Sequence, residues 1–192
     1  NILDASGLIF HVGSPSGGNR EESLDRAAKG LAAVLKDVSP TQRSGQAAFL
    51  VMENSGSLKK IGGSISDLEW LFKKVNNKRL KICIDTAHAF EAGLIESYTL
   101  MNIKKFFDEL DRAVGIKNVV ALHANDSKTK YNSQHDQHEN IGQGYIGLDG
   151  FKNLAKEKRI SHMRLFLEVP GYDGEGPDKP NMDTLKKCFS AL

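Results

Sequence analysis

The sequence predicts an α/β protein in which a parallel sheet is covered by helices. Short apolar runs alternate with longer amphipathic stretches, and the alternation recurs along the whole of the 192 residues. Each apolar run also ends in a side chain that can bind a metal ion. With 40% hydrophobic and 26% charged residues, the chain has the composition of one globular domain, so we treat residues 1–192 as a single domain.

The first two strand–helix units have clear signals. An apolar run at 7–11 is followed by a glycine-rich turn at 13–18, which we interpret as a plain connection rather than a phosphate loop. Apolar residues at helical spacing predict a helix over 21–37. The second strand spans 47–53, and Ser66-x-x-Glu69 predicts the capping box of the next helix.

Three further units repeat this plan. Parallel strands gather their carboxyl ends at one edge, where either an α/β barrel or an open doubly wound sheet binds ligands, and the pattern leaves these two topologies open. The predicted elements are strand 80–85, helix 100–114, strand 119–123, a polar loop at 124–145, helix 148–156, strand 163–168 and helix 183–191.

Every predicted strand ends in a possible metal ligand. One such residue alone is usually a helix cap or a surface group, but one from each of successive strands indicates a shared site. Mixed imidazole and carboxylate donors suit Zn²⁺ or Mn²⁺. These residues are His11, Glu53, Asp85, His123 and Glu168.

Three more residues extend this set. His88 follows Asp85 by three positions, so both can face one site from a single turn. Asp136 and His138 are two positions apart, and extended backbone points such side chains the same way. The glycines that follow, at 142, 144 and 147, indicate a tightly turned loop that approaches a ligand.

Taken together, these motifs resemble those of the endonuclease IV family of zinc-dependent apurinic/apyrimidinic endonucleases. The similarity runs in family order from Phe10 to Pro170, and the segments 85–88 and 136–142 are the most diagnostic. The resemblance implies a TIM (β/α)8-type barrel of which about five C-terminal βα units are present. Because the chain opens with Asn1 rather than Met and reaches a predicted strand at once, we expect N-terminal sequence to be missing.

The resemblance also implies a cluster of three zinc ions. The first site would also take a histidine from a preceding strand, and that histidine has no counterpart in this sequence. The implied roles are His11 in the first site, Glu53 bridging the first two sites, Asp85, His123 and Glu168 in the second, and His88, Asp136 and His138 in the third.

The reaction implied is hydrolysis of the phosphodiester 5′ to an abasic site in double-stranded DNA, together with removal of 3′-blocking groups. Clustered divalent cations suit this reaction because they lower the pKa of water from about 15.7 toward 7 and clamp the phosphate. We expect Glu53 and Glu168 to be catalytic, with Glu168 orienting the attacking hydroxide. The sequence does not identify the residues that contact DNA.

Two alternative functions stay open. Related sugar isomerases and epimerases would use a single metal at residues corresponding to Glu53, Asp85, His123 and Glu168, but they have no use for the third set. The other alternative is an inactive remnant that binds only metal or another chain.

Composition limits the possible partners. The net charge of +2 permits a polyanionic partner without indicating one, and two cysteines fit a reducing, intracellular compartment. We expect a soluble monomer with no membrane partner, because no apolar run approaches the length of a membrane span. The remaining polar or aromatic residues near the motifs receive structural interpretations (His135 in a loop, His162 at the opposite end, Cys83 and Trp70 in packing), while Asp126 and Lys128 stay open between capping and supporting the site.

Overall fold

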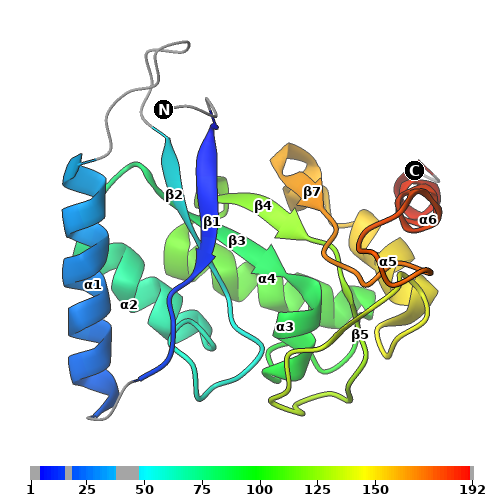
Figure 1. The fold of residues 1–192 in the computed structure, drawn as a ribbon, viewed down its shortest axis with the longest axis horizontal. Coiled ribbons are helices and arrows are strands. Elements are labelled where there is room, and N and C mark those ends of the chain that lie inside the picture. Colours follow the sequence, from blue (N-terminus) through cyan, green and yellow to red (C-terminus); the bar gives the residue numbers. More distant parts are fainter. Residues whose placement is uncertain (1–4, 16–18, 38–47, 191–192) are drawn as a thin grey trace.

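Five parallel strands form a curved sheet in the computed structural model, which describes residues 5–15, 19–37 and 48–190 (Figure 1). The strands follow chain order, and within the described residues β1 and β7 form the two edges. Every predicted strand is present. The strands are β1 (Gly7–His11), β2 (Phe49–Glu53), β3 (Leu80–Asp85), β4 (Val119–His123) and β7 (Arg164–Phe166).

Helices follow the strands and pack along the sheet (Figure 1). The predicted helix over 100–114 has the predicted ends, whereas the last helix begins four residues earlier than expected. None of the described helices combines the length and the apolar character needed to cross a membrane. The helices are α1 (Arg20–Asp37), α2 (Ile65–Val75), α4 (Leu100–Val114), α5 (Gly147–Ala155) and α6 (Lys179–Ser190), with short 3₁₀ turns η1 (Ile116–Asn118) and η2 (Lys158–His162).

Some elements depart from the sequence prediction. A short helix, α3 (Thr86–Glu91), follows β3 directly, and the polar loop contains an antiparallel pair of β5 (Asp126–Ser127) with β6 (His138–Glu139). The last strand is shorter than predicted, so Glu168 lies two residues beyond β7. The predicted turn, strand and helix residues at 16–18, 47 and 191 lie outside the described residues.

Side chains alternate between the two faces of the sheet, as the two-residue period of a strand requires. Met52, Ile82 and Leu122 belong to the main core beneath the helices. Val51 and Cys83 lie on the opposite, concave face, so Cys83 is a packing residue as predicted. Glu53 and Asp85 follow Val51 and Cys83 by two positions, so the side chains that end these strands lie on the concave face as well.

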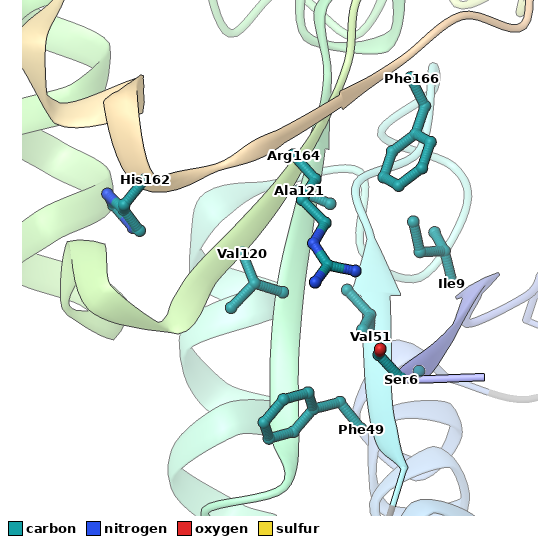
Figure 2. Close-up of a pocket in the computed structure, with 10 residues that line it drawn as sticks. Ser6, Ile9, Phe49, Val51, Val120, Ala121, His162, Arg164 and Phe166 are labelled. Atoms are coloured by element: carbon teal, nitrogen blue, oxygen red, sulfur yellow. The ribbon is translucent and has the colours of Figure 1, made fainter. Parts of the chain in front are cut away.

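The concave face is hollowed and mostly apolar away from the strand ends. Figure 2 shows Ile9, Phe49 and Val51 from β1 and β2 facing Arg164 and Phe166 of β7 across this hollow. His162 lies at the amino-terminal end of the sheet, where its Nε2 is 3.1 Å from the carbonyl oxygen of Val119. That position confirms that His162 is remote from the carboxyl ends of the strands, where the predicted metal ligands lie.

A β-bulge adjusts the register between β3 and β4. Ile82 pairs with Val119, but Cys83 pairs with Ala121, so Val120 is the extra residue. Because of this shift, Val119 and Leu122 both join the main core, although they are three positions apart. The bulge leaves Asp85 directly opposite His123.

The start of α2 corrects the predicted capping box. Ser64, rather than Ser66, is the N-cap, and its hydroxyl accepts a hydrogen bond from the backbone N–H of Asp67 at 3.1 Å. Ser66 lies inside the helix, and Glu69 pairs with Lys73 one turn later. The correct motif is therefore Ser64-x-x-Asp67. Trp70, on the same helix, packs against the core as predicted.

This correction predicts different costs for two neighbouring serines. Ser64→Ala should lower the free energy of unfolding by about 1 kcal/mol, because the N–H of Asp67 loses its acceptor. Ser66→Ala should change it by less than about 0.5 kcal/mol. Urea denaturation of the two variants measures both values. A larger loss of unfolding free energy for Ser66→Ala than for Ser64→Ala would contradict the assignment of Ser64 as the N-cap.

Candidate metal centre

The strand ends bring the predicted ligands together. His11, Glu53, Asp85 and His123 are the last residues of β1, β2, β3 and β4. Register places His11 opposite Glu53, and Asp85 opposite His123. Glu168 reaches the same edge from the segment after β7, where its backbone N–H donates to Oδ1 of Asn125 at 2.7 Å.

One set of ligand atoms, which we call the strand-end group, comprises Glu53, Asp85, His123 and Glu168. One donor atom from each lies within 4.8 Å of the others. Nδ1 of His123 is 2.9 Å from a carboxylate oxygen of Glu53 and 2.9 Å from one of Glu168. The first three residues are buried, whereas the Glu168 side chain is 49% exposed. The group therefore opens to solvent on one side.

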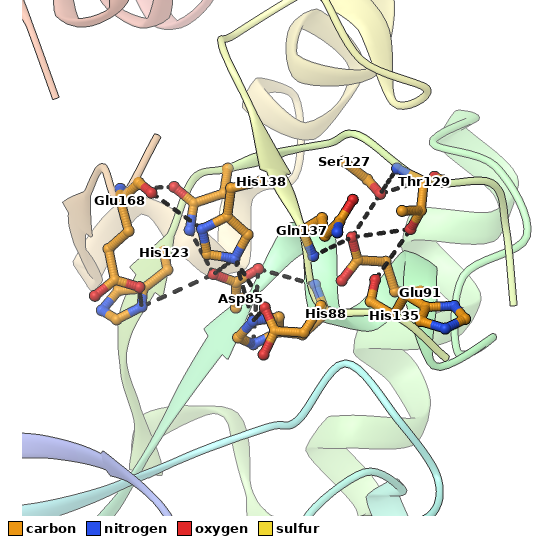
Figure 3. A network of polar contacts seen from close by, with 12 residues as sticks. Asp85, His88, Glu91, His123, Ser127, Thr129, His135, Gln137, His138 and Glu168 are labelled. Atoms are coloured by element: carbon orange, nitrogen blue, oxygen red, sulfur yellow. Dashed lines mark hydrogen bonds and ion pairs between the residues drawn. The ribbon is translucent and has the colours of Figure 1, made fainter. Parts of the chain in front are cut away.

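A second set, the outer group, comprises His88, Asp136 and His138. Nε2 of His88 lies 3.0 Å from Oδ1 of Asp136. It also lies 3.2 Å from Nε2 of His138, and both histidines are drawn in Figure 3. His138 Nε2 is in turn 3.7 Å from Oδ1 of Asp136 and 3.7 Å from Oδ2 of Asp85. Asp85 therefore stands between the strand-end and outer groups.

His88 also faces a third set of ligand atoms. Its other ring nitrogen, Nδ1, lies 3.4 Å from Glu53 Oε1, and His11 Nε2 lies 3.8 Å from Glu53 Oε2. Donor atoms of His11, Glu53 and His88 fall within 4.8 Å of one another. The sequence prediction paired His11 with Glu53 alone, and the geometry adds His88 between this pair and the outer group.

The protonation of these groups follows from their charges. Burial opposes a charged His88, but the carboxylates of Asp85 and Asp136 outweigh it and raise the pKa of His88 to about 10. Burial likewise opposes protonation of His123, yet contacts with Cys83, Glu168 and Glu53 hold its pKa far above the usual value. Without a cation, the imidazoles themselves supply the positive charge that the clustered carboxylates require.

Two asparagines that sequence reasoning did not assign hold the strand ends in place. Asn54 accepts from the backbone N–H of Asp85 at 2.6 Å and donates to the Asp85 carbonyl at 3.3 Å. Asn125 donates to Oδ2 of Asp85 while it orients the Glu168 backbone. Their signal in the sequence is their place one or two residues after a strand-end ligand.

The glycine-rich loop surrounds the side chain of Asp126. The sequence indicated that this loop approaches a ligand, and the group that it approaches is this carboxylate. The buried carboxylate of Asp126 accepts hydrogen bonds from backbone N–H groups of its own strand and of the loop, namely Ser127, Gly142, Gly144, Ile146 and Gly147. A Cβ at Gly144 would lie 2.3 Å from the Ser127 carbonyl oxygen, which explains the glycine. Asp126 is therefore a structural residue.

Another carboxyl, Glu91 on α3, is buried beside the outer group without belonging to it. Burial is the largest influence on this group and raises its pKa to about 7, against hydrogen bonds from Ser127 and Gln137 that favour the charged form. Sequence reasoning missed Glu91. His135, in contrast, is exposed in the loop, as predicted.

The donor sets fit divalent metal ions. Nε2 atoms of His88 and His138 face each other at 3.2 Å beside an aspartate, an arrangement in which an imidazole pair and a carboxylate converge on one point. The strand-end group concentrates three carboxylates around one imidazole. Nitrogen and oxygen donors in this combination suit Zn²⁺ or Mn²⁺.

Comparisons with known proteins agree with this geometry. Residues 2–188 match the family described as the xylose isomerase-like TIM barrel. The chain is 33% identical over 181 residues to a probable endonuclease 4 of Aquifex aeolicus, a match that covers 94% of this chain and 61% of that protein. It is 34% identical over 168 residues to apurinic-apyrimidinic endonuclease 1 of Schizosaccharomyces pombe, covering 86% and 47% of the two chains.

Solved structures place the fold in the same group. Endonuclease IV of Thermus thermophilus superimposes with a TM-score of 0.75 at 28% identity, covering all of this chain and 64% of that one. A D-tagatose 3-epimerase-like protein gives 0.67 at 20% identity, over 98% and 64% of the chains, which supports the fold alone. The barrel fold and the resemblance to endonuclease IV are confirmed. The chain spans about three fifths of the length of the bacterial relatives cited.

The raised pKa of Glu91 predicts how the stability of the metal-free protein depends on pH. Because this pKa is about 7 when folded and 4.5 ordinarily, the folded state holds the extra proton between these values. The resulting stabilisation is complete below about pH 4.5 and is lost as the pH rises through about 7. Urea denaturation across this window should show the free energy of unfolding falling, and Glu91→Gln should make the fall shallower. Equal slopes for both proteins would contradict the assignment.

Proposed function

The chain belongs to the xylose isomerase-like TIM barrel family, and on that premise we propose that it carries the metal centre of an endonuclease that cleaves DNA at abasic sites. The proposed reaction is hydrolysis of the phosphodiester 5′ to the abasic sugar in double-stranded DNA, with trimming of 3′-blocking groups, by a monomer. The names of the relatives from Aquifex aeolicus and Schizosaccharomyces pombe support this class of activity.

The observation that carries the proposal is the outer group beside the strand-end group. A single-metal sugar isomerase requires only the strand-end group. Here donor atoms of His88 and His138 also gather with one of Asp85, and Oδ1 of Asp136 lies 3.0 Å from Nε2 of His88. We propose zinc at both groups and at His11 with Glu53, with Mn²⁺ as a possible substitute. When bound, these ions would activate water at neutral pH and neutralise the charge of the phosphate.

Glu168 has the properties of a residue that orients the attacking water. The hydrogen bond with His123 is the main influence on Glu168 and lowers its pKa, so the carboxylate is ionised at neutral pH. Its side chain is 49% exposed, so water reaches it. In the proposed reaction Glu168 accepts a hydrogen bond from the attacking water, whose oxygen forms a bond to phosphorus as the water releases a proton to solvent. The bond from phosphorus to the 3′ oxygen breaks, and the departing 3′ oxygen takes up a proton from solvent.

Lys60 is positioned to bind the phosphate. Its ammonium lies 3.3 Å from Oδ2 of Asp136 at the solvent side of the outer group. The loop that carries it is held from two sides, because Arg20 donates to the Lys60 carbonyl and Gln134 accepts from the N–H of Leu58. A lysine on a fixed loop beside the metal groups is a suitable partner for an anionic substrate.

An incision assay on a duplex that carries one abasic site tests the proposed activity. The zinc-loaded protein should nick the strand 5′ to the lesion, and a chelator should abolish the nicking. Glu168→Gln should lower the rate by a factor of about 10² to 10⁴, since it replaces the anionic carboxylate that orients the attacking water with a neutral amide. Well-folded, zinc-loaded protein that fails to nick would favour the inactive remnant.

Replacing Lys60 should weaken substrate binding more than chemistry. Lys60→Met should raise KM for the abasic duplex with little change in kcat, and should reduce the salt dependence of binding by about one phosphate contact. Lys105→Met is a matched control, because Lys105 is exposed on the outer helix α4. An unchanged KM and salt slope in the Lys60 variant would exclude a phosphate contact.

A further inference from the structure

Glu91 connects two parts of the molecule that supply the outer group. Its side chain is fully buried, and a single oxygen, Oε1, accepts three hydrogen bonds. The donors are the hydroxyl of Ser127 at 2.8 Å, the backbone N–H of Gln137 at 3.2 Å and the hydroxyl of Thr129 at 3.3 Å (Figure 3). All three belong to the segment 127–137, which leads from β5 to β6 and carries Asp136.

The backbone of α3 holds the same segment. The carbonyl of Glu91 accepts from the N–H of Gln134 at 3.0 Å, and the carbonyl of Phe90 accepts from the N–H of Asn132 at 3.1 Å. His88 lies one turn earlier on this helix. The helix therefore presents one ligand itself and fastens the segment that carries Asp136 and leads directly to His138.

The second carboxyl oxygen of Glu91, Oε2, is buried next to Gly56 in a closely packed region. Among the described residues, Oε2 of Glu91 is the one buried side-chain polar atom that lacks a hydrogen-bond partner. A Cβ at Gly56 would lie 2.9 Å from this oxygen, 3.2 Å from Cβ of Asp136 and 3.3 Å from Cδ2 of His88. Gly56 is thus packed closely between this oxygen and two ligands of the outer group. A buried polar atom without a partner costs free energy.

We infer that Glu91 is a positioning residue, which sets the affinity of the outer group for a divalent cation by holding Asp136 and His138 against His88. The inference rests on the proposed metal-dependent function. Some residues hydrogen-bond to metal ligands without binding the metal themselves. Replacing such a residue typically lowers the affinity for the metal by about 10–100-fold. The oxygen that accepts the three hydrogen bonds is the atom that matters, so a side chain that keeps an acceptor there should preserve the site.

Titration of the metal-free protein with Co²⁺, followed by its visible absorption spectrum, tests this role without any assay of activity. Glu91→Met retains the volume but removes the acceptor, and should weaken one class of Co²⁺ sites by about 10–100-fold while the class at the strand-end group is unchanged. Glu91→Gln retains an acceptor oxygen and should bind within about threefold of the original protein. Glu96→Gln, an exposed position after the same helix, is the matched control.

The possible outcomes separate this inference from the proposed function. Failure of the unaltered protein to bind Co²⁺ would remove the proposed metal centre itself. Binding by the unaltered protein, with Glu91→Met folded and equally tight at every site, would overturn the role of Glu91 alone. Equal losses in the Met and Gln variants would also overturn it. Should Glu91→Met fail to fold by circular dichroism, Ser127→Ala removes the shortest of the three donors and should weaken the same class of sites, and unchanged binding there would count against the inference.

Discussion

In a parallel sheet, the carboxyl ends of all strands lie at the same edge, so the last residues of neighbouring strands lie close together. In this chain, that constraint brings donor atoms of Glu53, Asp85 and His123 within 4.8 Å of one another at the carboxyl ends of β2, β3 and β4. The result is a concentration of carboxylates in a buried place, which is unfavourable unless positive charge accompanies them. Imidazolium rings supply that charge in the metal-free chain, and divalent cations can supply it when bound.

The strand ends alone would not fix the geometry of such a site. Amide side chains bridge neighbouring strands, because Asn54 holds the backbone of Asp85 and Asn125 holds that of Glu168. Asp126 organises the glycine-rich loop through backbone N–H groups, and Glu91 fastens the segment that carries Asp136. The ligands are thus held by a network of hydrogen bonds that buried side chains make.

Sequence reasoning predicted the part of this design that depends on periodicity. The strands and the strand-end ligands follow from short apolar runs that each end in a polar residue, and α4 follows from an amphipathic stretch. It missed α3, because every residue of this six-residue helix is buried and so no amphipathic pattern exists. It also misplaced the cap of α2, since Ser64 and Ser66 both stand before plausible partners and only the backbone conformation distinguishes them. The roles of Asn54 and Glu91 depend on contacts between distant segments, which one sequence does not reveal.

The proposed metal centre requires cations that side chains from separate strands hold jointly. Crystals grown with zinc and measured at the zinc absorption edge would locate these ions directly. We predict anomalous peaks at two places, one enclosed by Glu53, Asp85, His123 and Glu168 and one enclosed by His88, Asp136 and His138. A map of well-ordered, zinc-soaked protein with no peak at either place would contradict it.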